Sequence, residues 1–257
     1  MLRVGAQMFT VREHIQTPEG FTESLGKIKD MGYKLVQISG AGRDIPVEYI
    51  AKALKESGLL CTVTHISYDD LLNDFDAVIR KHDAWECEYV GVGSMPVSYR
   101  NEEGMYRFAE EAGKISERLA KAGKKFVYHN HSFEFAKYGD KRGMDILFDN
   151  TPDTFQFELD MYWVQNAGAD PIAWTKKVAG RMDIMHFKDM DVDISVDERK
   201  GIIAPIGGGN MNWPGIVAAL NETGVQYGFV EQDICRKDPF ECLNDSLVYL
   251  KSIGVPV

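Results

Sequence analysis

Four polar side chains of the types that bind metal ions follow short apolar runs in the second half of the chain. They are Glu134, Asp160, His186 and Glu231, which lie in the segments 126–134, 155–160, 183–186 and 227–231. If these runs are strands of one barrel, their ends meet at a single point, where the four side chains could hold one divalent metal ion. Three carboxylates and one imidazole form an oxygen-rich site that suits Mn²⁺, Mg²⁺ or Co²⁺, and Zn²⁺ is also compatible with it. The pattern therefore predicts a metal-dependent enzyme.

The first of these runs offers more than one candidate ligand. His129, Asn130, His131 and Glu134 all lie near its end, and a bulge in the strand would decide which of them reaches the metal. We expect Glu134 to be the ligand, because a further carboxylate keeps the site oxygen-rich. His129 and His131 stay open as alternatives.

Each of the other three candidates also has a structural explanation. Asp160 could cap the helix that follows its strand, and His186 could be a buried histidine bonded to the backbone. Glu231 could be a surface acid paired with Arg236. Against these explanations, Glu158 and Asp160 share one face of a strand at a period of two residues. Two inward-facing acids need a metal or a cation as a partner.

Short β-rich runs alternate with amphipathic stretches eight times along the chain. We expect strands at 3–9, 35–39, 59–66, 89–93, 125–129, 154–159, 182–187 and 226–231. Helices are expected to begin at Thr17-Pro18 and Asp238-Pro239, where an N-cap residue precedes proline. They are expected to end at glycines, which are Gly32, Gly58, Gly123 and Gly224. The alternation predicts an α/β chain in which residues 1–257 form a single (β/α)8 TIM barrel domain rather than an open doubly wound sheet.

Composition limits the partners. The formal charge of −10 argues against a nucleic-acid partner, because binding to a phosphate backbone depends on clustered lysine and arginine. No run approaches the ~18 apolar residues of a membrane span, and the N-terminus lacks a signal-peptide pattern, so we expect a cytoplasmic protein with no membrane partner. The four cysteines are scattered and are expected to be buried free thiols. A homo-oligomer is compatible with all of this.

The connection after the seventh expected strand is unusually long. The segment 188–205 is expected to be a mobile loop that forms a wall over the site, and its acids are Asp189, Asp191, Asp193, Asp197 and Glu198. The glycines 207–209 that follow lack the spacing of a phosphate-binding loop. We expect them to form a turn before a helix opened by Asn212.

Several segments together resemble a known family. They are 5–12, 128–135, 158–163, 186–189 and 230–233, and the whole chain resembles the xylose isomerase-like barrel family, the sugar phosphate isomerase/epimerase group. The resemblance implies a (β/α)8 barrel with one divalent metal, bound through Glu, Asp, His and Glu from strands five to eight. By position it assigns Asp160, His186 and Glu231 as ligands. In many relatives the first Glu lies within the fifth strand, where this chain has His129, so the match at Glu134 is displaced.

The same resemblance implies a function. The metal would polarise a carbonyl and an adjacent hydroxyl of an unphosphorylated keto-sugar or polyol. Glu134 and Glu231, on opposite faces of the sugar, would remove and return the proton between them, which gives isomerisation or epimerisation through an enediolate. The residues expected to bind or cover the substrate are His65, His129, His131, Trp163 and Lys188, with Phe9 as an alternative cover for the sugar face.

Three other functions are compatible with such a barrel. A lyase, either an inosose dehydratase or an enzyme that cleaves 3-keto-glycosides, would use the same first step and then expel a substituent. A non-catalytic sugar-binding barrel would hold no metal. A DNA endonuclease with a three-metal cluster would need further histidines, but the fourth expected strand ends Gly91-Val-Gly-Ser94 and position 163 is Trp.

Overall fold

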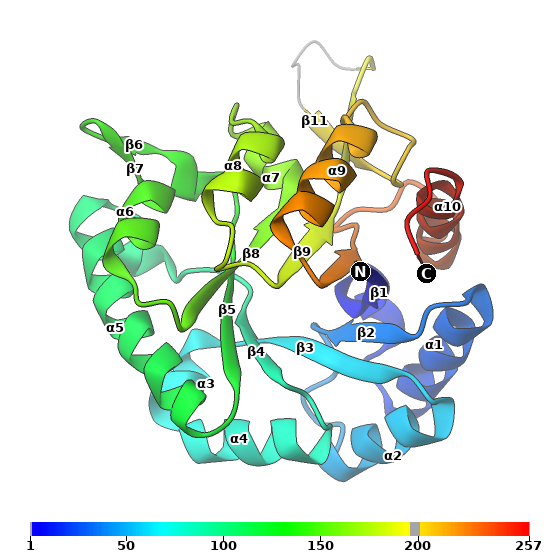
Figure 1. Ribbon diagram of the computed structural model, residues 1–257. Coiled ribbons are helices and arrows are strands. Elements are labelled where there is room, and N and C mark those ends of the chain that lie inside the picture. The colour runs from blue at the N-terminus through cyan, green and yellow to red at the C-terminus, as the bar shows by residue number, and fades with distance from the viewer. Residues whose placement is uncertain (1, 196–200, 257) are drawn as a thin grey trace.

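The computed structural model describes residues 2–195 and 201–256, and its centre is a closed barrel of eight parallel strands (Figure 1). Around the barrel the strands follow one another in chain order. They are β1 (Arg3–Gln7), β2 (Leu35–Ile38), β3 (Leu60–Ile66), β4 (Tyr89–Val92), β5 (Lys125–His129), β8 (Phe155–Asp160), β9 (Ile184–Phe187) and β12 (Tyr227–Val230). Each expected strand agrees with an observed one to within two residues at both ends, so the predicted (β/α)8 barrel is confirmed.

Helices surround the barrel on its outer side (Figure 1). The α-helices are α1 (Pro18–Met31), α2 (Val47–Ser57), α3 (Tyr68–Asn73), α4 (Phe75–Ala84), α5 (Glu102–Lys121), α6 (Gly143–Asn150), α7 (Met161–Asn166), α8 (Pro171–Lys177), α9 (Trp213–Thr223) and α10 (Pro239–Ser252). Three short 3-10 helices are η1 (Met8–His14), η2 (Val97–Tyr99) and η3 (Phe133–Phe135). No helix in the described part of the chain combines the length and apolar character needed to cross a membrane.

The expected helix boundaries are confirmed. The Thr17 hydroxyl accepts a hydrogen bond from the Gly20 N–H at the start of α1, and the Asp238 carboxylate caps α10 in the same way. Helices α1, α2 and α9 end at glycines with left-handed backbone angles, and Gly123 follows the last residue of the α5 cap. Because the left-handed conformation costs glycine little, these positions end each helix and return the chain to the barrel.

The barrel interior is apolar at one end and polar at the other. An inner cluster of apolar side chains consists of Leu35, Val63, Tyr89, Val127, Ile184, Tyr227 and Phe229. Polar residues lie two positions after five of these, and a period of two residues keeps them inside the barrel. They are Gln37, His65, His129, His186 and Glu231. In β8 the same alternation turns Phe157 and Leu159 towards the helices and leaves Glu158 and Asp160 facing inward, as predicted.

The connection after β9, which we expected to be a mobile loop, contains regular secondary structure. Strand β10 (Asp189–Val192) pairs antiparallel with β11 (Gly201–Ala204), so part of the segment forms a hairpin. The expected acids Asp197 and Glu198 lie outside the described residues. The described part of this expected loop thus contains paired strands, because β-branched residues such as Ile202 and Ile203 favour strand pairing.

Two further expectations concern the glycine-rich segment and the cysteines. The segment 207–209 forms a turn, and the N–H groups of Gly207 and Gly209 donate to the Asp189 carboxylate at 2.8 and 3.1 Å. A carboxylate of the chain itself thus satisfies the donors that a phosphate would need. All four cysteines are free thiols, and Cys235 is half-buried while the other three are buried.

Candidate metal centre and active site

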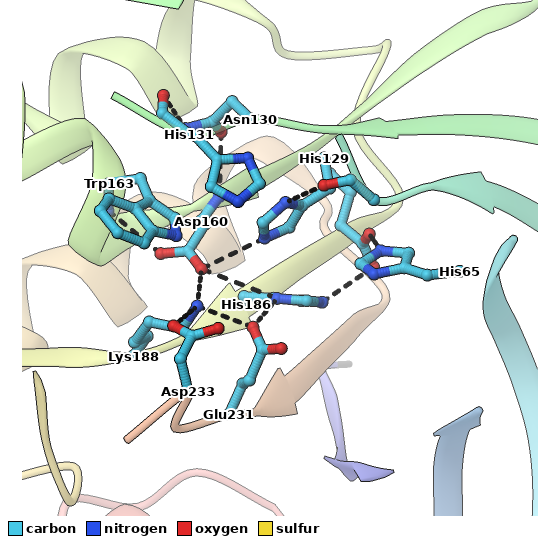
Figure 2. A network of polar contacts seen from close by, with 12 residues as sticks. His65, His129, Asn130, His131, Asp160, Trp163, His186, Lys188, Glu231 and Asp233 are labelled. Carbon is cyan, nitrogen blue, oxygen red and sulfur yellow. Dashed lines mark hydrogen bonds and ion pairs between the residues drawn. The ribbon is translucent and has the colours of Figure 1, made fainter. Parts of the chain in front are cut away.

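Four side chains of metal-binding types converge at the carboxyl ends of four neighbouring strands (Figure 2). They are His129 from β5, Asp160 from β8, His186 from β9 and Glu231, which follows β12. One ligand atom from each residue lies within 4.8 Å of those of the other three, and all four residues are buried. Sequence reasoning expected three of these four residues in the group and preferred Glu134 to His129 in the fourth position.

The period of the strands explains why these four residues meet. Val127, Ile184 and Phe229 belong to the apolar inner cluster, and each lies two residues before one member of the group. Since a strand places residues i and i+2 on one face, the inward position after each apolar residue falls at the carboxyl end of the barrel.

The imidazole of His129 aims its Nε2 atom at a carboxylate. Its Nδ1 atom lies 3.0 Å from the backbone oxygen of Gly93, which can only accept, so Nδ1 carries the hydrogen. When the ring is neutral, it points the lone pair of Nε2 at Asp160 Oδ2, 3.2 Å away. Two lone pairs that face each other need a proton or a metal ion between them.

His186 repeats this arrangement. Its Nε2 atom donates to Gln37 Oε1 at 2.7 Å, and its Nδ1 atom faces Glu231 Oε2 at 2.8 Å. Although burial lowers the pKa of His186, the carboxylates of Glu158 and Glu231 outweigh it and hold that pKa well above its usual range. Histidine ligands of metals usually donate their second N–H in this way, so the donor set fits a divalent metal ion.

Asp160 caps a helix and also belongs to the candidate metal group. Its Oδ1 atom accepts the backbone N–H of Trp163 at 3.1 Å and caps α7, while its Oδ2 atom faces the other three members. The helix-capping explanation is therefore correct, and it leaves one carboxylate oxygen free for the group. Burial raises the pKa of Asp160, but the Lys188 ammonium together with the His129 and His186 imidazoles outweighs burial and holds that pKa well below its usual range.

Lys188 adds a buried cation to the site. Its Nζ atom lies 2.8 Å from Asp160 Oδ2, from Glu231 Oε2 and from Asp233 Oδ2. Sequence reasoning expected Lys188 to bind substrate hydroxyls and missed Asp233. The sequence did hold a sign of Asp233, because it follows Glu231 at the spacing of two residues that keeps side chains on one face of a strand.

Glu134 lies outside the group. The chain leaves β5 after His129, and Glu134 lies in η3, where it is wholly buried. There its carboxylate accepts the Tyr128 hydroxyl at 2.6 Å and the His131 backbone N–H at 2.9 Å. Burial raises the pKa of Glu134 to about 7. The turn after β5, rather than the type of residue, keeps Glu134 away from the other three predicted ligands.

A cavity of about 420 Å³ opens over the group. Of the expected substrate-binding residues, His65, His129 and His131 line it, and Phe9 does so too. The other lining residues are Ser39, Ile66, Ser67, Tyr68, Asp69, Gly93, Ser94, Pro96, Glu231 and Asp233.

Trp163, the other expected cover for the sugar, does not line this cavity. Its ring lies 5.2 Å from the ring of His131, and the Lys188 Nζ atom lies 5.5 Å from its centroid. The Nδ1 atom of His131 is buried without a hydrogen-bond partner in the described part of the chain, and burial lowers its pKa to about 3. The neutral His131 ring therefore remains available to a bound molecule.

Comparisons with known proteins agree with this architecture. An inosose dehydratase from Clostridium beijerinckii is 27% identical over 169 residues, which cover 60% of this chain and 56% of that enzyme's own length. The structure of a sugar phosphate isomerase/epimerase from Parabacteroides distasonis superposes with a TM-score of 0.78 at 22% identity, covering 99% of this chain and 95% of that one. A probable 3-DHS dehydratase from Bacillus anthracis superposes with a TM-score of 0.72 at 13% identity, covering 98% and 99%.

The match to a family model is longer than the sequence match to the inosose dehydratase. The model described as "Xylose isomerase-like TIM barrel" matches residues 25–234, which include seven of the eight barrel strands and all four members of the candidate metal group. This chain belongs to the xylose isomerase-like TIM barrel family.

Proposed function

We propose that the protein is a divalent-metal-dependent enzyme that removes a proton next to the carbonyl of a keto-sugar or keto-polyol, and that it acts as a lyase. The observation that carries the proposal is the convergence of two imidazoles and two carboxylates beneath a cavity. Glu134 belongs neither to this group nor to the lining of the cavity. A cavity of about 420 Å³ has room for a molecule of sugar size.

The four members of the group are the proposed metal ligands, so His129 takes the position in which we expected Glu134. Two imidazole nitrogens and two carboxylate oxygens suit Mn²⁺, Co²⁺ or Zn²⁺ better than Mg²⁺, which prefers oxygen ligands throughout. When bound, the metal ion would polarise the substrate carbonyl and so lower the pKa of the adjacent carbon-bound proton.

The position of Glu134 favours elimination over epimerisation. An enzyme that inverts a carbon centre needs an acid–base group on each face of the substrate, and the sequence suggested Glu134 and Glu231 for that pair. Glu231 lines the cavity, whereas both oxygens of Glu134 are bonded within the protein. One carboxylate base on one face is sufficient for β-elimination.

The proposed elimination uses groups that line the cavity. Glu231 takes the proton from the carbon next to the carbonyl, a carbon–carbon double bond forms, and the β carbon–oxygen bond breaks. The departing oxygen takes up a proton and leaves as water or an alcohol. Asp233 lines the cavity, and burial raises its pKa, so it is the candidate to supply that proton.

The relatives support two outcomes. The inosose dehydratase and the probable 3-DHS dehydratase are described as enzymes that remove water, which favours the lyase. The sugar phosphate isomerase/epimerase superposes over almost the whole chain and keeps isomerisation or epimerisation as the second candidate.

One assay separates these outcomes. The purified Mn²⁺-loaded protein is incubated in D₂O with a keto-inositol and with 3-keto-glycosides, and the products are followed by NMR. We expect an unsaturated ketone together with released water or alcohol. Solvent deuterium at the carbon next to the carbonyl, without loss of a substituent, would instead identify an epimerase or isomerase. The absence of both reactions and of bound metal would identify a sugar-binding barrel.

The Glu231→Gln variant tests the assigned base. We expect its turnover to fall by about 10²-fold or more, the usual contribution of a general base. The Glu134→Gln variant is the matched control and should retain turnover. Full turnover by metal-loaded Glu231→Gln protein would remove Glu231 from this role.

A further inference from the structure

A third buried carboxylate, Glu158, lies beside the metal group without belonging to it. Glu158 is wholly buried in β8, two residues before Asp160. Its Oε2 atom lies 2.5 Å from His65 Nε2, and its Oε1 atom lies 3.2 Å from His186 Nε2. One carboxylate therefore contacts two imidazoles, of which one belongs to the proposed metal site and the other lines the cavity.

These contacts determine which nitrogen of each ring carries a hydrogen. An ionised carboxylate can only accept hydrogen bonds, so the Nε2 atom of His65 donates to Glu158. The negative charge of Glu158, 3.2 Å from the Nε2 atom of His186, favours a hydrogen on that nitrogen as well. Gln37 Oε1, 2.7 Å from the Nε2 atom of His186, accepts the hydrogen bond of that nitrogen and favours the same tautomer. Both rings then have an unprotonated Nδ1 atom when they are neutral.

The two Nδ1 atoms have different surroundings. That of His186 faces the metal group, as described above. That of His65 makes no hydrogen bond among the described residues, and His65 lines the cavity. A Cβ atom at position 93 would lie 2.8 Å from it, so Gly93 leaves open the space beside this nitrogen.

We propose that Glu158 is a positioning residue that sets the tautomers of both histidines, so that His186 presents a lone pair to the metal and His65 presents a lone pair to a substrate hydroxyl. The proposal rests on the metal site of the proposed function. Since His65 can then only accept at Nδ1, the substrate must offer a hydroxyl donor at that point. A single carboxylate would couple metal retention to recognition of that hydroxyl.

His65, Glu158 and His186 could instead hold an ion of their own, because one ligand atom from each lies within 4.8 Å of the others. The two alternatives predict different numbers of bound metal ions per chain. If Glu158 faces a ring N–H of both histidines, the protein binds one divalent ion per chain. If the three residues form a separate site, it binds two.

Metal titration by calorimetry tests the coupling to His186. We expect wild-type protein to bind one Mn²⁺ per chain and the Glu158→Gln variant to bind it about 10- to 100-fold more weakly, the usual effect of losing the partner of a ligand histidine. Glu134→Gln, which alters another wholly buried glutamate, is the matched control and should bind within about twofold of wild type. Equal affinity in wild type and Glu158→Gln, or two ions per wild-type chain, would overturn the proposal. Wild-type protein that binds no divalent ion would instead refute the proposed function.

Nitrogen NMR of ¹⁵N-histidine-labelled, Zn²⁺-loaded wild-type protein reads the tautomers directly and does not depend on a variant that folds. We expect a hydrogen on Nε2 of both His65 and His186. In Glu158→Gln protein, the His65 signals should shift towards the other tautomer or a mixture. A hydrogen on Nδ1 of His65 in the wild type, or an unchanged His65 tautomer in the variant, would contradict the assignment.

Discussion

The ammonium nitrogen of Lys188 lies 2.8 Å from the Oδ2 atom of Asp160, and neither side chain has any exposed surface. Glu231 and Asp233 each place a carboxylate oxygen at the same distance from that nitrogen. Lys188 therefore neutralises part of the negative charge that the barrel gathers around the proposed metal ligands. Without it, the buried carboxylates would face one another in a medium that screens charge poorly.

Removal of this cation should destabilise the fold. We expect Lys188→Met to lower the free energy of unfolding of the metal-free protein by about 3–5 kcal/mol, because it leaves buried carboxylates without their partner. The loss should be smaller in Mn²⁺-loaded protein, where the metal would neutralise Asp160 and Glu231. Urea denaturation with and without metal measures both values.

A surface lysine provides the comparison. Lys114→Met removes an exposed pair with Glu110 within one helix and should cost no more than about 0.5 kcal/mol. If the two variants lost the same amount, the buried ion pairs of Lys188 would contribute no more than a surface pair.

The assignment of His129 in place of Glu134 gives a second prediction. His129→Ala removes a proposed ligand and should weaken Mn²⁺ binding by more than the ~100-fold that loss of a ligand's partner can cause. Glu134→Gln should leave Mn²⁺ affinity unchanged, since an amide can still accept the His131 N–H and contact the Tyr128 hydroxyl. Calorimetric titration of both variants measures the effect. Loss of metal from Glu134→Gln, with retention by His129→Ala, would restore Glu134 as the ligand.

These two residues also show how far the sequence alone could lead. The eight strands were predictable because apolar residues alternate within each strand and helices end at glycines. The same period of two residues places His129 on the inner face of β5, two positions after the inward-facing Val127. We used this period for Glu158 and Asp160; for the fifth strand it would have favoured His129. Glu134 lies past the end of its strand, where the course of the chain depends on a turn that the residue types do not specify.

Contacts between distant segments were harder to predict. Gln37 bonds to His186 across 149 residues of sequence, and Asp233 pairs with Lys188 only because two strands adjoin in the closed barrel. The one local signal for Gln37 was a polar residue inside a four-residue strand that is otherwise apolar. Such a signal identifies an inward polar group but not its partner.

The carboxylate of Asp189 gives a third prediction, which concerns the hairpin and the glycine-rich turn. Its oxygens accept four backbone N–H groups, from Met190, Gly207, Gly209 and Met211. Hydrogen bonds to a charged group contribute about 1.5–3 kcal/mol each, and part of that is regained through water when the group is removed. We expect Asp189→Ala to lower the free energy of unfolding by about 3 kcal/mol, measured by urea denaturation.

Asp191, two residues further along the same strand, is the matched control. Its side chain accepts one hydrogen bond, from Asn210, at the surface. Asp191→Ala should therefore change the free energy of unfolding by less than about 1 kcal/mol. Equal losses in the two variants would show that the bonds to the turn contribute nothing beyond a surface contact.

His82 gives a prediction for the pH dependence of stability. It is wholly buried in α4, where its Nδ1 atom donates to the Val78 carbonyl at 2.7 Å and its Nε2 atom accepts the Thr64 hydroxyl at 2.8 Å. Burial lowers its pKa to about 4, below the ~6.5 of a histidine in the unfolded chain. The unfolded chain therefore binds a proton more readily than the folded one. The contribution of His82 is fully present above about pH 6.5 and is lost as the pH falls towards 4.

A pair of denaturation curves isolates this effect from the other titrating groups. Between pH 7 and pH 4.5, wild-type protein should lose about 2 kcal/mol more of its free energy of unfolding than the His82→Gln variant, which has no titrating group at this position. The pKa values of Glu134 and His131 also differ between the folded protein and the unfolded chain. Both proteins share these differences, so their effects cancel when the two losses are subtracted. Equal losses in the two proteins would mean that His82 accepts a proton in the folded state as easily as in the unfolded chain. In that case the Thr64 hydroxyl would have to reverse its hydrogen bond and accept from the ring, a change that the ring NMR signals at pH 4.5 would reveal.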